Sequence, residues 1–157
     1  MQIKDTLPRA VALTIVAGLA TIVAISAPRR AAADNDGRGR GCSESTLRGD
    51  YAFAIDGQIL AGPKAGLLRG VAMTHFDGDG GLSQVDFTTI NGVPIGTDWR
   101  PGTGSYEINA DCTGKAQINF TDGSPALHLR LVVADRGDQV RTIVEGNATG
   151  SFGTRVR

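Results

Sequence analysis

The stretch KAQINFTDGSPALHLRLVVA (residues 115–134) contains two runs of alternating apolar and polar residues with a turn sequence between them. In the first run Ala116, Ile118 and Phe120 fall on one face, and in the second Leu and Val residues alternate with His128 and Arg130. A period of two residues is typical of a β-strand with one buried face. The intervening TDGSP is rich in residues that favour tight turns. The stretch therefore predicts an antiparallel β-hairpin.

Runs of the same kind recur on both sides of this hairpin. They cover residues 51–60, 67–76, 82–90, 104–110, 139–146 and 150–156, separated by short segments rich in Gly, Asp and Asn. Only CSESTLRGD (42–50) indicates a capped helical turn, with Ser43 placed before Thr46. Short strands joined by hairpins can close on themselves and hide both sheet edges, and no Cys-Trp-Cys pattern favours an immunoglobulin-like sandwich. We therefore predict an all-β fold, an eight-stranded antiparallel up-and-down barrel, behind a disordered or helical N-terminal signal segment.

The first residues of the chain resemble an export signal. Lys4 and Arg9 precede an uncharged run, AVALTIVAGLATIVAISA (10–27), which is followed by PRRAAAD with an Ala-x-Ala cleavage site. We expect a signal peptide over residues 1–33, a flexible leader over 34–41 and the barrel domain over 42–157. The apolar run is also just long enough to span a bilayer, so an uncleaved membrane anchor is the alternative.

The charge balance of the expected mature chain limits the kinds of partner that it can bind. Residues 34–157 contain 12 Lys and Arg against 15 Asp and Glu, without a basic patch, which argues against nucleic acid as a partner. The only membrane contact we expect is through an uncleaved signal segment.

Cys42 and Cys112 both fall in the exported part, periplasmic or extracellular, where two thiols most simply form a disulfide. It would close a loop of about 70 residues and contribute roughly 4 kcal/mol. A metal or redox pair is the alternative, and the absence of CxxC spacing disfavours it.

The segment HFDGDGGLS (75–83) raises the question of a calcium loop, because Asp77 and Asp79 alternate with glycines. An EF-hand loop needs glycine at position 6 and glutamate at position 12. Counted from Asp77, these positions hold Leu82 and Thr88, and the flanking runs predict strands rather than helices. The segment therefore predicts a hairpin turn, with an adventitious weak cation site as the alternative.

Several short motifs, in this order and spacing, resemble a group of small exported bacterial proteins, mostly uncharacterised. The motifs are Cys–x4–Leu–x–Gly–x–Tyr, Phe-Asp-Gly-x-Gly, Gly-x-Tyr and Asp-Cys-x-Gly. The matching residues here are Cys42, Leu47, Gly49, Tyr51, Phe76, Asp77, Gly78, Gly80, Tyr106, Asp111, Cys112 and Gly114. More loosely, the chain resembles the calycin-like barrels of allene oxide cyclases and lipocalin-type carriers. That resemblance implies a lumen that holds an apolar molecule, and it carries over no catalytic residue because no cyclase motif matches.

Motifs for catalysis by nucleophile, phosphate loop or zinc are missing from the sequence. The period of its strand predicts that His128 is exposed. Val71, Met73 and His75 share one face of their strand, so an inward face would place an imidazole beside a thioether, where it could tune a pKa or bind a soft metal. The preferred alternative is an exposed histidine beside the turn at Asp77. One Met and one His are too few ligands for copper, and we predict no cofactor and no metal.

Outward, solvated carboxylates are expected at two further positions, Asp86 and Glu107.

The apolar face of the barrel is the remaining candidate site. Side chains expected to point inward are Phe53, Met73, Phe87, Ile108, Phe120, Leu129 and Leu131, and the polar groups that could join them in the lumen are Tyr51, His75 and Tyr106. An eight-stranded barrel is either filled by its side chains or just wide enough for one small ligand. Three hypotheses follow: a carrier of a small apolar ligand, an allene-oxide-cyclase-like cyclase or isomerase acting on an apolar substrate, and a structural surface protein with a filled core.

Overall fold

The structure is a computed structural model that describes residues 41–157. The predicted signal peptide and all but the last residue of the predicted leader lie outside the described residues. Within the described part no helix is long and apolar enough to cross a membrane.

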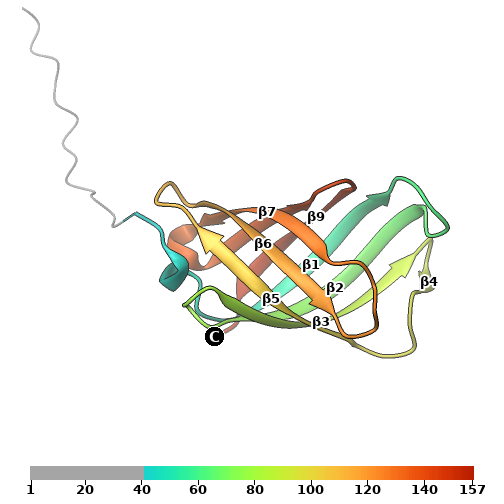
Figure 1. Cartoon of the computed structure of the whole chain (residues 1–157), viewed down its shortest axis with the longest axis horizontal. Coiled ribbons are helices and arrows are strands. Elements are labelled where there is room, and N and C mark those ends of the chain that lie inside the picture. Colours follow the sequence, from blue (N-terminus) through green and yellow to red (C-terminus); the bar gives the residue numbers. More distant parts are fainter. Residues whose placement is uncertain (1–40) are drawn as a thin grey trace, which may run out of the picture. The chain divides into compact units, whose positions relative to one another are not determined.

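Antiparallel strands make up most of the described chain (Figure 1). They are β1 (Gly49–Ile59), β2 (Gly66–Phe76), β3 (Gly81–Ile90), β4 (Val93–Pro94), β5 (Arg100–Ile108), β6 (Thr113–Phe120), β7 (Leu127–Ala134), β8 (Gln139–Val144) and β9 (Ala148–Arg155). Two short 3-10 turns, η1 (Glu44–Thr46) and η2 (Asp135–Gly137), complete the elements.

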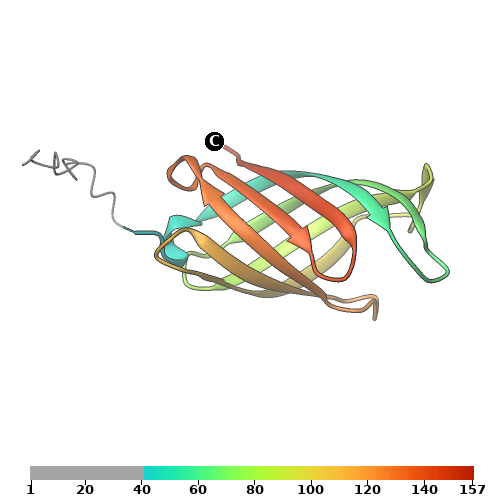
Figure 2. The ribbon, with the colours of Figure 1, turned by 90° about the horizontal axis from the view of Figure 1, so that it is seen from above.

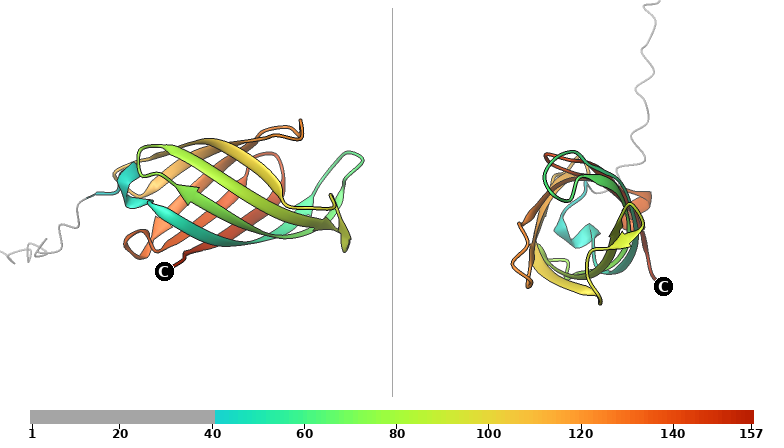
Figure 3. Two further views of the ribbon diagram at one scale, coloured as in Figure 1. Left: turned by 90° about the horizontal axis from the view of Figure 1, so that it is seen from below. Right: turned by 90° about the vertical axis from the view of Figure 1, so that its right-hand side faces the viewer.

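The sheet closes into a barrel. Strands pair in the order β2-β1-β9-β8-β7-β6-β5-β3, and β2 also pairs with β3, so the ring has no free edge. The two-residue β4 only extends the rim beside β3. Viewed along its axis, the barrel is a ring of strands around η1 (Figure 3, right), and the side views show the strands inclined to that axis (Figure 2). The predicted eight-stranded antiparallel barrel is confirmed.

Strand positions agree with the sequence prediction to within about two residues, except that the short β4 was predicted as loop and that β5 begins earlier. This strand begins at Arg100, four residues before the expected start, and Pro101 pairs with Val85 of β3. A proline cannot donate a backbone hydrogen bond, which is why the sequence favoured a loop there. Proline is nevertheless compatible with the first residues of a strand. Its carbonyl also accepts a hydrogen bond from the Thr121 N–H, at 3.3 Å.

One end of the barrel is closed by η1 and the residue that follows it. The predicted capping interaction is present, because the Ser43 N–H donates to Thr46 Oγ1 at 3.0 Å. Leu47 is fully buried. The Tyr106 hydroxyl lies 2.9 Å from the Leu47 carbonyl oxygen and accepts a hydrogen bond from the Gly78 N–H at 3.0 Å. These contacts fix the segment as a plug, which we define as residues 42–47.

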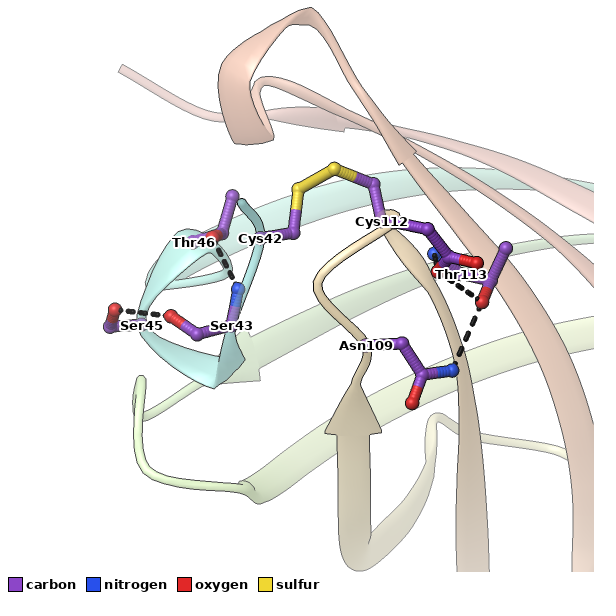
Figure 4. The surroundings of a disulfide bond; sticks show 8 residues. Cys42, Ser43, Ser45, Thr46, Asn109, Cys112 and Thr113 are labelled. Atoms are coloured by element: carbon purple, nitrogen blue, oxygen red, sulfur yellow. Dashed lines mark hydrogen bonds between the residues drawn. A yellow bond between two sulfur atoms is a disulfide. The ribbon is translucent and has the colours of Figure 1, made fainter. Parts of the chain in front are cut away.

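A disulfide ties the plug to the barrel wall, as predicted. Cys42 is bonded to Cys112 in the turn between β5 and β6 (Figure 4). The Cys42 N–H also donates to the Ala110 carbonyl oxygen at 3.2 Å. In the same turn Asp111 accepts hydrogen bonds from Thr113, which lower the pKa of the Asp111 carboxyl. The plug is thus held covalently and by backbone contacts to a rigid turn.

The segment HFDGDGGLS forms the predicted hairpin turn. Asp77 Oδ1 accepts hydrogen bonds from the N–H groups of Asp79 and Gly81, at 2.7 and 2.9 Å. Gly78 and Gly80 adopt positive φ angles of 86° and 98°, which glycine tolerates without strain. The Asp77 carboxylate therefore serves the turn itself. No cluster of three or more His, Cys, Asp or Glu side chains suited to a metal ion occurs within residues 41–157.

Candidate functional site

Burial of the inward-facing side chains changes along the barrel axis. In β1, Tyr51 and Phe53 are buried, whereas Ile55 and Ile59 further along the same inner row are half-exposed. The inner rows of β2, β7 and β8 also change from buried near the plug to half-exposed at the other end. The inner rows of β3 and β6 stay buried toward this end. The lumen is therefore closed at the plug and more exposed at the opposite end, on the side of β1, β2, β7 and β8, and we call this end the mouth. The hairpin between β1 and β2 and the strand β4 lie at this end (Figures 1 and 2).

A cavity of about 70 Å³ lies in the lumen. Most of its wall is apolar, with contributions from β1, β2, β3, β6, β7 and β8. The apolar lining residues are Phe53, Ile55, Ala72, Phe76, Leu82, Ala116, Ile118, Leu127, Leu129, Leu131, Val140 and Val144. Polar side chains line the rest, namely Thr74, Gln84, Asp86, Thr142 and Ser151. The cavity thus has the composition of a small-molecule site, apolar with a few placed polar groups.

A chain of polar side chains runs along β2 and β3 on the cavity wall. Thr74 Oγ1 lies 3.3 Å from Gln84 Oε1, and Gln84 Nε2 lies 3.4 Å from Asp86 Oδ2. Asp86 is 2% exposed and is held by Arg100 from β5. The guanidinium donates from Nε to Oδ1 at 2.9 Å and from Nη2 to Oδ2 at 2.8 Å. We call these four residues the polar stripe.

Arg100 is fixed on its other side by an aromatic ring. Its Cζ lies 3.6 Å from the centroid of the Phe120 ring, a cation–π geometry. The guanidinium is therefore held from two sides, and the two charges of the pair compensate each other inside the barrel. The attraction within a buried ion pair repays the desolvation of its two charges only partly. A contribution to stability is therefore a weak explanation for this pair.

A second polar feature lies across the lumen from the stripe. Thr142 of β8 and Ser151 of β9 share a hydrogen bond of 2.7 Å between their hydroxyl oxygens. In the ring of strands β8 lies opposite β3, so the two polar features flank the apolar part of the cavity. Both hydroxyls are half-buried near the mouth.

Seven of the ten predicted ligand-binding residues are found in or near the interior. Phe53, Leu129 and Leu131 line the cavity. The other four are buried without lining it: Tyr51, Tyr106, Ile108 and Phe120. Their role in binding stays a prediction.

The predicted inward orientation of Met73 and Phe87 is wrong. Met73 is 40% exposed, and its strand neighbours Ala72 and Thr74 are the buried ones. Phe87 points outward and packs against Trp99, with ring centroids 6.1 Å apart. The inner rows of β2 and β3 contain small and polar residues, and their larger apolar residues face outward. Strand alternation alone therefore favoured the wrong face.

His75 lies on the outer surface beside the turn at Asp77, which is the alternative that the sequence analysis preferred. Its Nδ1 is 2.8 Å from Oδ1 of Asp50, and both side chains are more than half exposed. The lumen hypothesis for this imidazole is therefore wrong. His128 is exposed as predicted.

Asp86 is the main residue that the sequence analysis misplaced. Its alternation with Val85 and Phe87 predicted an outward carboxylate, as for Glu107, which is indeed exposed. The structure instead buries Asp86, because Val85 and Phe87 occupy the outer face. The signal that could have identified it is the run Gln84, Asp86, Thr88, a polar inner row that needs a buried partner such as Arg100.

The two buried tyrosines are engaged with backbone groups at the plug end. The Tyr51 hydroxyl donates to the Gly137 carbonyl oxygen, and that of Tyr106 lies within bonding distance of Leu47. Burial raises the pKa of both phenols, and the nearby Arg155 guanidinium opposes this effect at Tyr51. Both hydroxyls are thus used to close the barrel end.

Comparison of the chain with protein-family models, with curated proteins and with solved structures yields no match. The barrel itself is consistent with a calycin-like architecture. The more specific family resemblance stays a prediction.

Proposed function

We propose that this protein is exported and binds a small, mainly apolar molecule in the barrel lumen. The observation that carries the proposal is the asymmetry of the barrel, which is closed by a disulfide-bonded plug at one end and open at the other. A purely structural barrel could fill both ends alike. The half-exposed apolar side chains at the mouth, Ile55, Leu127 and Val144, provide an apolar entrance to the cavity.

The cavity volume limits the size of the ligand. Drug-sized ligands occupy pockets of about 300–1,000 Å³. The cavity of about 70 Å³ takes only a few non-hydrogen atoms. A slender ligand is therefore favoured, with its end enclosed in the cavity and the remainder in the mouth.

Export is supported by the disulfide, which is compatible with an oxidising compartment. It is also supported by the pattern of residues 1–33, which lie outside the described residues. A small apolar ligand is the partner that this proposal implies.

Native mass spectrometry on protein purified from the exported fraction of its host tests the proposal. An extra mass that leaves on denaturation identifies the ligand class. Ile55→Arg places a charge in the mouth and should abolish this mass. Gln58→Arg, on the outer face of the same strand, is the matched control and should keep it. A bare protein that also stays bare after incubation with lipid and terpenoid extracts would support the filled-core alternative instead.

A cyclase-like enzyme is the second candidate, and the polar stripe is the observation that favours it. A fixed ion pair beside an apolar cavity can orient a reactive substrate. Of the polar residues first considered, His75 lies outside the lumen, and Tyr51 and Tyr106 bond to backbone carbonyls. The stripe is therefore the only part of the described lumen in which we place such a role. Turnover of a bound ligand, lost in Gln84→Leu with folding retained, would distinguish this candidate from the carrier.

A further inference from the structure

The polar stripe has hydrogen-bonding capacity left over beside the cavity. A glutamine side chain offers two N–H donors and two acceptor lone pairs. Gln84 uses one lone pair for the Thr74 hydroxyl and directs one N–H toward Asp86. The orientation of the amide follows from Asp86, because a carboxylate can only accept. One N–H and one lone pair of Gln84 therefore stay available, and the Thr74 oxygen can also accept.

Both side chains are almost completely buried, so water competes little for these groups. Gln84 is 9% exposed and Thr74 is 4% exposed, and both line the cavity. Gln84 and Thr74 each have a hydrogen-bond partner already, so only the remaining capacity is open to a ligand. A ligand oxygen beside them gains a hydrogen bond in a site from which water is largely excluded, and a hydrocarbon does not.

The neighbouring ion pair decides which charge the polar group of the ligand can have. Both oxygens of Asp86 are bound by Arg100, so the pair is neutral as a whole. An anionic group beside Gln84 would lie near the Asp86 carboxylate, and a cationic group would compete with the fixed guanidinium. In a cavity shielded from water both arrangements are unfavourable.

We propose that the ligand is a neutral amphiphile, an apolar chain or ring bearing a hydroxyl or carbonyl group that bonds to Gln84 and Thr74. This inference rests on the proposed function and specifies its ligand class. The polar oxygen lies at the stripe, and the apolar part extends between the aliphatic side chains toward the mouth. The free N–H of Gln84 donates to the ligand oxygen, and a ligand hydroxyl donates to Gln84 or Thr74.

Six-carbon probes that differ only in the polar group test the proposal. 1-Hexanol, hexanoate, hexylammonium and n-hexane are titrated into the full protein at pH 7, and binding is followed by amide chemical shifts. We expect hexanol to bind at least about tenfold more tightly than the other three, the equivalent of one hydrogen bond or about 1.4 kcal/mol. Equal binding of hexane and hexanol, or tighter binding of hexanoate or hexylammonium, would overturn the neutral-amphiphile inference and leave the carrier function standing. Failure of all four to bind would overturn the carrier function itself.

Two substitutions of similar shape locate the contact. Gln84→Leu and Thr74→Val should each weaken hexanol binding about tenfold and leave hexane binding unchanged or tighter. Ser83→Ala, on the outer face of β3, is the control and should change neither affinity. Circular dichroism verifies that each variant is folded. An unchanged affinity for hexanol in both folded lumen variants contradicts the assignment.

A separate observation concerns the outside of the barrel. Apolar side chains form continuous cross-strand rows on the outer surface of β9, β1, β2 and β3. Ala54 pairs with both Val71 and Phe152, and Val71 pairs with Phe87, which contacts Trp99. Beside them Met73 pairs with Ala52 and Val85. We call these residues the outer apolar face: Ala52, Ala54, Val71, Met73, Val85, Phe87, Trp99 and Phe152.

The opposite side of the barrel is more polar, with Val132 and Ile143 as its exposed apolar side chains on β7 and β8. Its outer surface carries the ion pairs Glu107–Lys115 and Arg130–Glu145, at 3.0 and 2.6 Å. Five large apolar residues of the outer apolar face are between 38% and 51% exposed: Val71, Met73, Val85, Trp99 and Phe152. A contiguous apolar patch of this kind is characteristic of an interaction surface.

The charges around the outer apolar face point to a second copy of this chain as the partner. Asp50 and His75 flank it on the plug side, and Asp56 and Arg69 flank it on the mouth side. Asp56 and Arg69 form an exposed pair within one chain, with 3.7 Å between Oδ2 and Nη1, and such a pair exchanges partners at little cost. Two copies related by a two-fold axis can therefore place the Asp56 carboxylate of one against the Arg69 guanidinium of the other. An apolar centre with aromatic and Met side chains and a polar rim is the usual composition of a homodimer interface.

Sedimentation velocity of the full protein tests this assignment. We expect a dimer at micromolar concentration, and we expect Val71→Asp to make it monomeric. Val132→Asp, at a similarly exposed position on β7, is the matched control and should leave the dimer intact. Trp99, the single tryptophan, should show blue-shifted emission in the dimer and red-shifted emission in Val71→Asp. A monomer throughout, or a dimer unaffected by Val71→Asp, would overturn the proposal.

Discussion

Gly153 lies directly opposite Phe53 across β9 and β1, and the Phe53 ring occupies the space that a side chain at position 153 would need. A Cβ atom built at Gly153 would lie 2.4 Å from Cε1 of Phe53. Since a buried aromatic ring cannot move aside without disturbing the cavity wall, we expect Gly153→Ala to destabilise the fold by about 1–3 kcal/mol. Urea unfolding followed by circular dichroism measures this change.

A surface glycine provides the control for this effect. Gly96 lies in the loop before β5, and a Cβ there would meet only the Asp98 carbonyl oxygen, at 3.9 Å. Gly96→Ala should therefore stay within about 0.5 kcal/mol of the parent. Equal effects of the two substitutions would show that Phe53 does not restrict position 153.

The disulfide between Cys42 and Cys112 should stabilise the barrel mainly through the unfolded chain. It joins residues 70 positions apart. In the chain-entropy account a loop of that length contributes roughly 4 kcal/mol. We expect Cys42→Ala/Cys112→Ala to lose about that amount in urea unfolding. The plug should also exchange its amide hydrogens faster than the strands do. Unchanged protection of Leu47 would show that the contacts of the Tyr106 hydroxyl hold the plug without the covalent link.

Acidification should weaken the turn at Asp77. Hydrogen bonds from the N–H groups of Asp79 and Gly81 lower the pKa of the Asp77 carboxyl below its ordinary value of 3.8. Because the folded-state pKa is the lower one, the carboxylate stabilises the fold above about pH 4. This contribution is lost as the pH falls through the folded-state pKa. Asp77→Asn should therefore be less stable than the parent at pH 7, and the difference should shrink at pH 3, as measured by urea midpoints.

Asp79→Asn is the matched control, since it removes the same charge from the same turn. The N–H of Asp79, rather than its carboxylate, takes part in the hydrogen bond to Asp77. Its urea midpoint at pH 7 should stay close to that of the parent. A difference between Asp77→Asn and the parent that grows on acidification would contradict the assigned direction of the pKa shift.

The sequence predicted the strands and the closure well because both depend on local patterns. Alternation and turn residues locate β6 and β7 within two residues, and the strand count with hairpin connections favours a closed ring. Local pattern could not decide which face of β2 and β3 points inward. There Val71, Met73 and Phe87 are the more apolar choice for the interior. The pairing of β2 with β1 places the other face inward, because residues paired across strands point to the same side of the sheet and the inward Tyr51 pairs with Thr74.

The site was predicted only in part for the same reason. The apolar wall contains residues that the pattern identified, such as Phe53 and Leu129. The polar stripe depends on pairing between Asp86 of β3 and Arg100 of β5, which are joined only in three dimensions. An aspartate between two apolar residues is usually solvated, so its burial could be seen only after the register was known.

The Asp86–Arg100 pair provides the last prediction, on the energetics of the stripe. Arg100→Met leaves the buried Asp86 carboxylate without its partner. We expect a loss of about 3 kcal/mol, at the lower end of the range for buried pairs because the Arg100 side chain is 21% exposed. Replacing both residues, as in Asp86→Leu/Arg100→Met, removes the buried charge and should bring the stability back to within about 1 kcal/mol of the parent.

The exposed pair of Asp56 and Arg69 is the control for this comparison. Its side chains are 72% and 67% exposed, and the closest N···O distance is 3.7 Å. Arg69→Met should therefore cost less than about 1 kcal/mol. Urea unfolding of the parent and the three variants separates the two cases. If Arg100→Met cost no more than Arg69→Met, the stripe would be accessible to water. The lumen could not then distinguish a neutral ligand from a charged one.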